Sequence, residues 1–251
     1  MTEPSGSAKQ PDIRLFHLLP NLLTIAAICA GLTAIRFGYE GNYEMAAHLV
    51  LAACVLDGLD GRLARLMKHE TAVGAELDSL ADFLNFGVAP VLILHSWALQ
   101  DLPNAGWIAV LFYAVCCVLR LARFNVSSRL ESSATTSDFF IGVPSPAGAI
   151  LVLFPMVVSF ALSDLPLAPP AVVAFHVCLV GALMISPLPT YSFKGTTINR
   201  ANAKYALLVA AILVAFLLTY LWATLAVLTV LYISCLVWAY RTYRIAKKFK
   251  G

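Results

Sequence analysis

The sequence predicts an all-α integral membrane protein with about eight transmembrane helices and both termini in the cytoplasm. Hydrophobic residues make up 60% of the 251-residue chain and charged residues only 12%, whereas soluble domains carry about 25% charged residues. Apolar segments close to the ~20 residues that cross a bilayer recur along the chain. We expect helices at His17–Phe37, Tyr43–Leu63, Leu77–Trp97, Trp107–Arg123, Pro146–Leu162, Pro169–Leu188, Ala203–Tyr220 and Leu221–Tyr240.

The basic residues predict the orientation. With eight helices, one side of the membrane receives 16 of the 17 Lys and Arg residues, and Arg36 alone lies near the other face. An odd number of helices would scatter these charges over both faces. Because cytoplasmic loops carry an excess of Lys and Arg, the crowded side is expected to face the cytoplasm, together with both termini.

In chain order, the sequence predicts a tail, one membrane domain and a second tail. Residues 1–16 form a polar N-terminal tail that includes a short interfacial segment. Residues 17–240 form a single transmembrane domain, whose first apolar stretch is too long for the core of a signal peptide and is expected to be a retained helix. Residues 241–251 form a basic cytoplasmic tail.

Four carboxylates lie within or beside two of these apolar segments: Asp57, Asp60, Asp78 and Asp82. An Asp at the centre of a membrane helix costs about 2.5–3.5 kcal/mol on insertion scales, so a group of four requires a water-lined cavity, bound cations, or both. Offsets of three and four residues place each pair on one helix face. Because the turn Met67–Gly74 joins the two helices, we expect an inward-facing cluster near the cytoplasmic surface.

Oxygen ligands alone favour a hard divalent cation, Mg²⁺ or Mn²⁺. Two such ions roughly balance four carboxylates, and a two-metal site suits attack on a phosphoryl group because the ions hold the attacking and the leaving oxygens. Gly61 and Ala64 lack bulk where a diphosphate and a nucleotide would approach the helix. Arg65 offers a forked cation for phosphate oxygens.

These residues belong to a longer pattern, D-x2-D-G-x2-A-R-x8-G-x3-D-x3-D. It is met by Asp57, Asp60, Gly61, Ala64, Arg65, Gly74, Asp78 and Asp82. The segment resembles the signature of the CDP-alcohol phosphatidyltransferases, membrane enzymes that move a phosphatidyl group from a CDP-linked lipid to an alcohol. Eight fixed positions across 26 residues make the resemblance specific.

The resemblance implies a role for each residue. Asp57, Asp60 and Asp78 would be metal ligands, and Asp82 would be both a ligand and the general base. Contacts to the CDP-lipid would be made by Gly61, Ala64, Arg65, Thr71, Gly74, Pro20, Asn21 and Thr24. An alternative for Pro20 and Asn21 is that they start the first helix, with Asn as its cap. The resemblance also implies a homodimer.

Two further segments bear on the identity of the alcohol. Arg120–Asn125 reads RLARFN, and Gly142–Ala149 reads GVPSPAGA. Both resemble segments of the membrane-bound, second type of phosphatidylserine synthase of bacteria and archaea, as does the LLPNLLT that opens the first helix. This resemblance implies CDP-diacylglycerol and L-serine as substrates, and phosphatidylserine and CMP as products, at the cytoplasmic membrane.

Serine offers a carboxylate and an ammonium group. A carboxylate suits a bidentate Arg, and Arg120 and Arg123 lie three residues apart on one helix face. Asn125 or Ser145 can then accept hydrogen bonds from the ammonium group. The alternative for both Arg residues is that they anchor the helix in the membrane or contact lipid phosphates.

The same residues are compatible with other functions. Within the family, the acceptor can instead be glycerol 3-phosphate, inositol phosphate or choline, although choline favours an aromatic cage. From another class, an ion-coupled transporter can hold its coupling ion in an Asp cluster. Against that, the four Asp form a compact hairpin near one membrane face, with no sign of broken helices in paired halves. Membrane lipids are expected partners, and nucleic acid is not.

Overall fold

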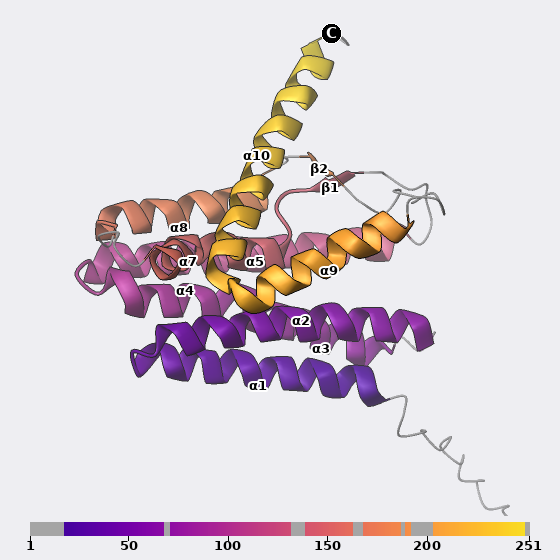
Figure 1. Cartoon of the computed structure of the whole chain (residues 1–251), viewed down its shortest axis with the longest axis horizontal. Helices are drawn as coiled ribbons and strands as arrows, with labels where there is room; N and C mark the ends of the chain where they lie inside the picture. Colours follow the sequence, from indigo (N-terminus) through magenta and orange to yellow (C-terminus); the bar gives the residue numbers. More distant parts are fainter. Residues whose placement is uncertain are drawn as a thin grey trace, which may run out of the picture.

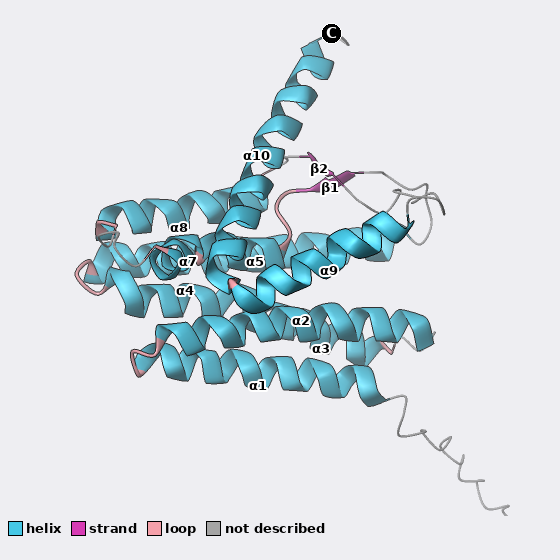
Figure 2. Cartoon of the chain, in the orientation of Figure 1, coloured by secondary structure: helices cyan, strands magenta, loops and turns pink. Residues whose placement is uncertain are grey.

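The computed structural model describes residues 18–67, 71–131, 139–162, 168–186, 189–191 and 203–248. Helices dominate it (Figure 2). They are α1 (Leu19–Tyr39), α2 (Tyr43–Met67), α3 (Ala72–Asp82), α4 (Ala89–Leu94), α5 (Pro103–Glu131), α6 (Ser145–Val152), α7 (Phe154–Ala161), α8 (Pro170–Ile185), α9 (Ala203–Thr219) and α10 (Leu221–Lys248). The predicted polar tail at 1–16 and residues 249–251 of the basic tail lie outside the described residues.

Four of these helical stretches are long and apolar enough to cross a membrane: Leu19–Tyr39, Ala72–Leu99, Pro103–Ser127 and Leu221–Thr242. Pro170–Ile185 and Lys204–Thr219 are shorter apolar helices. By length and composition the chain is therefore a helical integral membrane protein, as predicted. Eight crossings remain a prediction, and α10 runs at a steep angle to the neighbouring helices rather than alongside them (Figure 1).

Helices α1 and α2 form an antiparallel hairpin and lie side by side (Figure 1). Their buried faces are rich in small residues, which include Ala27 and Ala34 on α1 and Ala46 and Ala53 on α2. Small side chains let two backbones approach closely, which is how helices associate in a membrane where burial of apolar surface gives little driving force. This packing fixes the start of α1 against the carboxyl-terminal half of α2.

The third predicted helix is continuous but not regular. Two π-helical segments, η2 (Phe83–Val88) and η3 (His95–Leu99), flank α4. Pro90 has no N–H to donate to the carbonyl of Phe86 four residues earlier, and the hydroxyl of Tyr113 on α5 donates to that carbonyl instead, at 2.9 Å. The Tyr113 side chain is fully buried. The irregular turn directly after Asp82 is thus fixed by a neighbouring helix.

The same arrangement recurs where the predicted helix Pro146–Leu162 breaks into α6 and α7. Pro155 cannot donate to the carbonyl of Leu151, and Nε2 of His176 on α8 donates to it at 2.8 Å. Inside a membrane every backbone carbonyl needs a partner, so a side chain from the next helix takes the place of the missing N–H. His176 therefore stabilises the break between α6 and α7.

A short strand pair departs from the all-α prediction. β1 (Phe139–Ile141) and β2 (Pro189–Tyr191) pair antiparallel, with Phe140 opposite Thr190 (Figure 2). Three residues per strand give too weak an alternation to be read from the sequence. The pair joins the segment before α6 to the segment after α8, and α10 packs against β2 and α7.

Candidate active site

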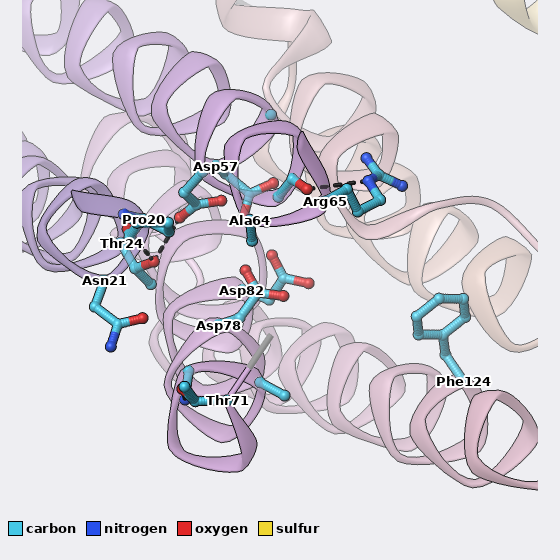
Figure 3. A pocket seen from close by; sticks show the side chains of 15 residues that line it. Pro20, Asn21, Thr24, Asp57, Ala64, Arg65, Thr71, Asp78, Asp82 and Phe124 are labelled. Carbon is cyan, nitrogen blue, oxygen red and sulfur yellow. Dashed lines mark hydrogen bonds between the residues drawn. The ribbon is translucent and has the colours of Figure 1, made fainter. Parts of the chain in front are cut away.

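A cavity of about 600 Å³ opens between the starts of α1 and α3 and the carboxyl-terminal halves of α2 and α5 (Figure 3). It is lined by Pro20, Asn21, Thr24, Asp57, Gly58, Asp60, Gly61, Ala64, Arg65, Thr71, Gly74, Ala75, Asp78, Asp82 and Phe124. All four predicted carboxylates and all eight predicted CDP-lipid contacts are in this lining. The structure therefore brings together residues that the sequence separates by up to 62 positions.

The carboxylates come from two helices that face each other. Asp57 and Asp60 lie one turn apart on α2, and Asp78 and Asp82 lie one turn apart on α3. Asp57, Asp60 and Asp78 each offer an oxygen within 4.8 Å of the others. Asp82 lies close to Asp57, and the two carboxyl groups interact. Figure 3 shows Asp57, Asp78 and Asp82 directed into the same space.

Asp60 is the most tightly held of the four. Its side chain is 3% exposed, and its Oδ2 accepts a hydrogen bond of 2.6 Å from Oγ1 of Thr24 on α1. Its Oδ1 is buried and has no hydrogen-bond partner in the described part of the chain. One oxygen is thus fixed by protein while the other is left to bind something else. Thr24, expected to approach the nucleotide, also positions a carboxylate, a contact that its place in the sequence did not indicate.

These observations fit a divalent cation. Among the described residues, no Lys or Arg forms an ion pair with any of the four Asp. Uncompensated carboxylates this close together repel one another, and a hard cation with oxygen ligands satisfies both the charge and the free Oδ1 of Asp60. The donor set is oxygen only, as predicted.

The wall formed by α2 leaves open space. A methyl group added at Gly58 or Gly61 would meet nothing within 4 Å, so the absence of side chains there enlarges the cavity rather than relieving a clash. Arg65 is exposed at the mouth, where its Nε donates to the carbonyl of Gly61 at 3.0 Å (Figure 3). The remaining nitrogens of its guanidinium point away from the helix and can meet an anion.

The starts of α1 and α3 meet at one corner of the cavity. Thr71 caps α3, because its Oγ1 accepts from the backbone N–H of Gly74 at 3.0 Å. A methyl group on Gly74 would lie 2.9 Å from Oδ1 of Asn21, so the glycine lets the Asn21 side chain lie against the start of α3. Asn21 does not cap α1, whose first turn begins after Leu18 without a side-chain cap. The alternative of Asn21 as a helix cap is therefore wrong.

The four residues predicted to hold serine lie outside this lining. Nη1 of Arg120 donates to Oγ of Ser145 at 2.5 Å, Nη1 of Arg123 donates to the carbonyl of Ile185 at 3.1 Å, and Asn125 donates to Oγ of Ser79 at 2.9 Å. Arg120 nevertheless lies within electrostatic range of Asp82. From the same segment the cavity receives Phe124, which we did not predict (Figure 3).

The fold and the site together define a helical membrane protein with a carboxylate-lined cavity suited to cation-assisted phosphoryl chemistry. The chain belongs to the CDP-alcohol phosphatidyltransferase family, whose sequence profile matches residues 17–188. The match begins just before α1 and ends after α8, so it includes every residue of the cavity and excludes α9 and α10.

Curated relatives carry the name CDP-diacylglycerol–serine O-phosphatidyltransferase. The chain is 51% identical to the Mycobacterium leprae protein over 138 residues, which is 55% of this chain and 46% of that one. It is 39% identical to the Mycobacterium tuberculosis (strain H37Rv) protein over 208 residues, or 82% of this chain and 72% of that one. It is 35% identical to the Bacillus subtilis protein over 179 residues, or 71% of this chain and 92% of that one. The chain thus matches less than half the length of the M. leprae relative.

Proposed function

We propose that this protein is a CDP-diacylglycerol–serine O-phosphatidyltransferase, which makes phosphatidylserine and CMP from CDP-diacylglycerol and L-serine. The observation that carries the proposal is the cavity, in which the signature residues of α2 and α3 surround one space. The names of the relatives support serine as the alcohol. The resemblance of Arg120–Asn125 and Gly142–Ala149 to the serine-specific subfamily points the same way.

The CDP-lipid binds in the cavity. The open space over Gly58 and Gly61 accommodates the diphosphate, and Arg65 at the mouth pairs with a phosphate oxygen. The nucleotide lies toward the corner formed by Asn21, Thr71 and Gly74. The full set of contacts that we propose is Gly61, Ala64, Arg65, Thr71, Gly74, Pro20, Asn21 and Thr24.

The carboxylates of Asp57, Asp60, Asp78 and Asp82 would hold Mg²⁺ or Mn²⁺, with two ions as the number that matches their charge. Such ions, when bound, offset negative charge on the diphosphate and on the departing CMP. The chain supports this with an ordered ligand set, because the hydroxyl of Thr24 holds one oxygen of Asp60 and leaves the other free.

Asp82 acts as the general base. It takes the proton from the serine hydroxyl as that oxygen attacks the β-phosphorus of CDP-diacylglycerol in line with the bond to CMP. The new bond joins the serine oxygen to phosphorus, and the bond that breaks releases CMP with its electron pair. Because a carboxylate is a weak base for an alcohol, proton transfer is concerted with attack. Arg120, Arg123, Asn125 and Ser145 hold serine on the α5 side of Asp82.

The site faces the cytoplasm, where serine and the nucleotide are soluble. Arg62 and Arg65 lie at the end of α2 that carries the site, and Arg36, the exception in the charge distribution, lies at the opposite end of the α1–α2 hairpin. There it forms an exposed ion pair of 2.7 Å with Glu40. We also propose that the protein works as a homodimer in the cell membrane.

The experiment that tests the proposal compares acceptors. Purified protein in detergent receives CDP-diacylglycerol, Mg²⁺ or Mn²⁺, and in separate reactions serine, glycerol 3-phosphate, inositol phosphate or choline, and CMP release is followed. Serine-dependent release supports the proposal. Release with glycerol 3-phosphate and not with serine would show that the acceptor is a different alcohol, while the proposed phosphatidyl transfer would stand. No release with any acceptor would contradict the proposal as a whole.

A further inference from the structure

Two polar atoms on the α5 side of Asp82 are buried without a partner. Nε of Arg120 and the hydroxyl of Tyr232 on α10 are each enclosed, and neither forms a hydrogen bond with any described residue. Buried polar groups in folded proteins are nearly always hydrogen-bonded, so each of these atoms calls for a partner that the described residues do not supply. Both are hydrogen-bond donors.

The two atoms belong to one polar group of side chains. Arg120 lies within electrostatic range of both Tyr232 and Asp82. Its Nη1 donates to Oγ of Ser145, which is fully buried at the start of α6. Arg120 therefore interacts with polar side chains of three other helices: Asp82 of α3, Ser145 of α6 and Tyr232 of α10.

Helix α10 reaches this place because it crosses the other helices at a steep angle (Figure 1). It packs against α7 and β2, and β2 pairs with β1 just before Gly142. Tyr232 packs against the apolar core with its hydroxyl directed inward, where it is shielded from the membrane. Its position lies beyond residue 188, outside the region that the family profile matches.

We propose that Tyr232 is a specificity residue of the acceptor site and donates a hydrogen bond to the carboxylate of serine. The inference rests on the proposed function. The Arg120 guanidinium supplies the positive charge that the carboxylate requires, and Tyr232 supplies a second donor from α10. The ammonium group then faces Ser145, and the serine hydroxyl is directed at Asp82. An acceptor with a carboxylate satisfies both unpartnered donors, whereas choline satisfies neither.

The test is Tyr232→Phe, with Tyr240→Phe as its matched control. Tyr240 lies two turns further along the same helix and is 45% exposed. We expect the KM for serine to rise about tenfold or more in Tyr232→Phe, as for loss of a hydrogen bond to a charged group. We expect the KM for CDP-diacylglycerol and kcat to stay within about twofold of wild type, and Tyr240→Phe to match wild type in all three.

Thermal unfolding in detergent separates binding from a structural role. Because the hydroxyl has no partner in the folded protein, its removal should leave Tm unchanged or raise it. An unchanged KM for serine would overturn the inference, as would a fall in Tm with equal rises in both KM values. If wild-type protein releases no CMP with serine, the proposed function fails. If wild-type protein releases CMP with serine and Tyr232→Phe shows the same dependence on serine concentration, only the inference about Tyr232 fails.

Discussion

Oγ1 of Thr24 donates a hydrogen bond of 2.6 Å to Oδ2 of Asp60, and thereby joins the first helix to the carboxylate cluster of the second. Hydrogen bonds of this kind orient metal ligands, and their removal costs about 10- to 100-fold in metal affinity. We therefore expect Thr24→Val to shift the Mg²⁺ dependence of CMP release to concentrations at least tenfold higher, with smaller loss at saturating Mg²⁺.

Thr33→Val is the matched control. The hydroxyl of Thr33 lies on the same helix and donates to the carbonyl of Cys29 in its own helix. Its removal should leave the Mg²⁺ dependence as in wild type. Equal Mg²⁺ curves for Thr24→Val and wild type would show that the contact to Asp60 does not serve metal binding.

Asp82 is expected to be needed for turnover rather than for folding. A positioned general base contributes about 10²- to 10⁴-fold, so Asp82→Asn should lower kcat by at least two orders of magnitude. The elution volume of the purified variant should match that of wild type. Asp101→Asn, a change at an exposed position in the turn before α5, should keep full activity. Near wild-type turnover in Asp82→Asn would refute the assignment of the base.

Cation binding is expected to stabilise the fold. A ligand that binds only the folded state at about 100 times its Kd adds about 2.7 kcal/mol. We predict that Mg²⁺ or Mn²⁺ raises the Tm of the wild-type protein above its value in a chelator. The double variant Asp57→Asn, Asp78→Asn should show little such rise, and it should be more stable than wild type in chelator because like charges are removed. A metal-independent Tm in wild type would contradict the site.

Tyr113 and Phe86 give a prediction about the irregular turn after Asp82. The backbone carbonyl of Phe86 cannot accept a hydrogen bond from Pro90, and Tyr113→Phe also removes the hydroxyl that donates to it. The free energy of unfolding should fall by about 1–3 kcal/mol. Thermal unfolding in detergent measures the loss. Tyr205→Phe, which removes a hydroxyl from a side chain that is 60% exposed, should cost much less. Equal stability of the two variants would mean that the carbonyl finds another partner.

The sequence predicted which carboxylates lie together, but not the irregular helix that follows them. Asp57, Asp60, Asp78 and Asp82 were predictable as one cluster because helical spacing and a short connecting turn leave little freedom. The π-helical segments were not, although Pro90 could have signalled an unpaired carbonyl at Phe86. Which side chain serves such a carbonyl depends on how α5 packs, and that is a tertiary contact without a local pattern.

The proposed serine-binding residues also depend on tertiary contacts that the sequence does not reveal. The sequence predicts Arg120 and Ser145 from two separate segments, and the structure joins them by a hydrogen bond. Tyr232 gave no signal, because a single Tyr in an apolar helix resembles any interfacial aromatic residue. Its relation to Arg120 arises only from the angle at which α10 crosses the other helices.

We propose that the carboxylate cavity transfers a phosphatidyl group to serine. This proposal is tested by following CMP and phosphatidylserine together in one reaction of purified protein with CDP-diacylglycerol and labelled serine, with and without chelator. We predict that the two products form in equal amounts, that omission of serine stops CMP release, and that chelator abolishes both. CMP release that proceeds without serine, or product formation unaffected by chelator, would contradict the account.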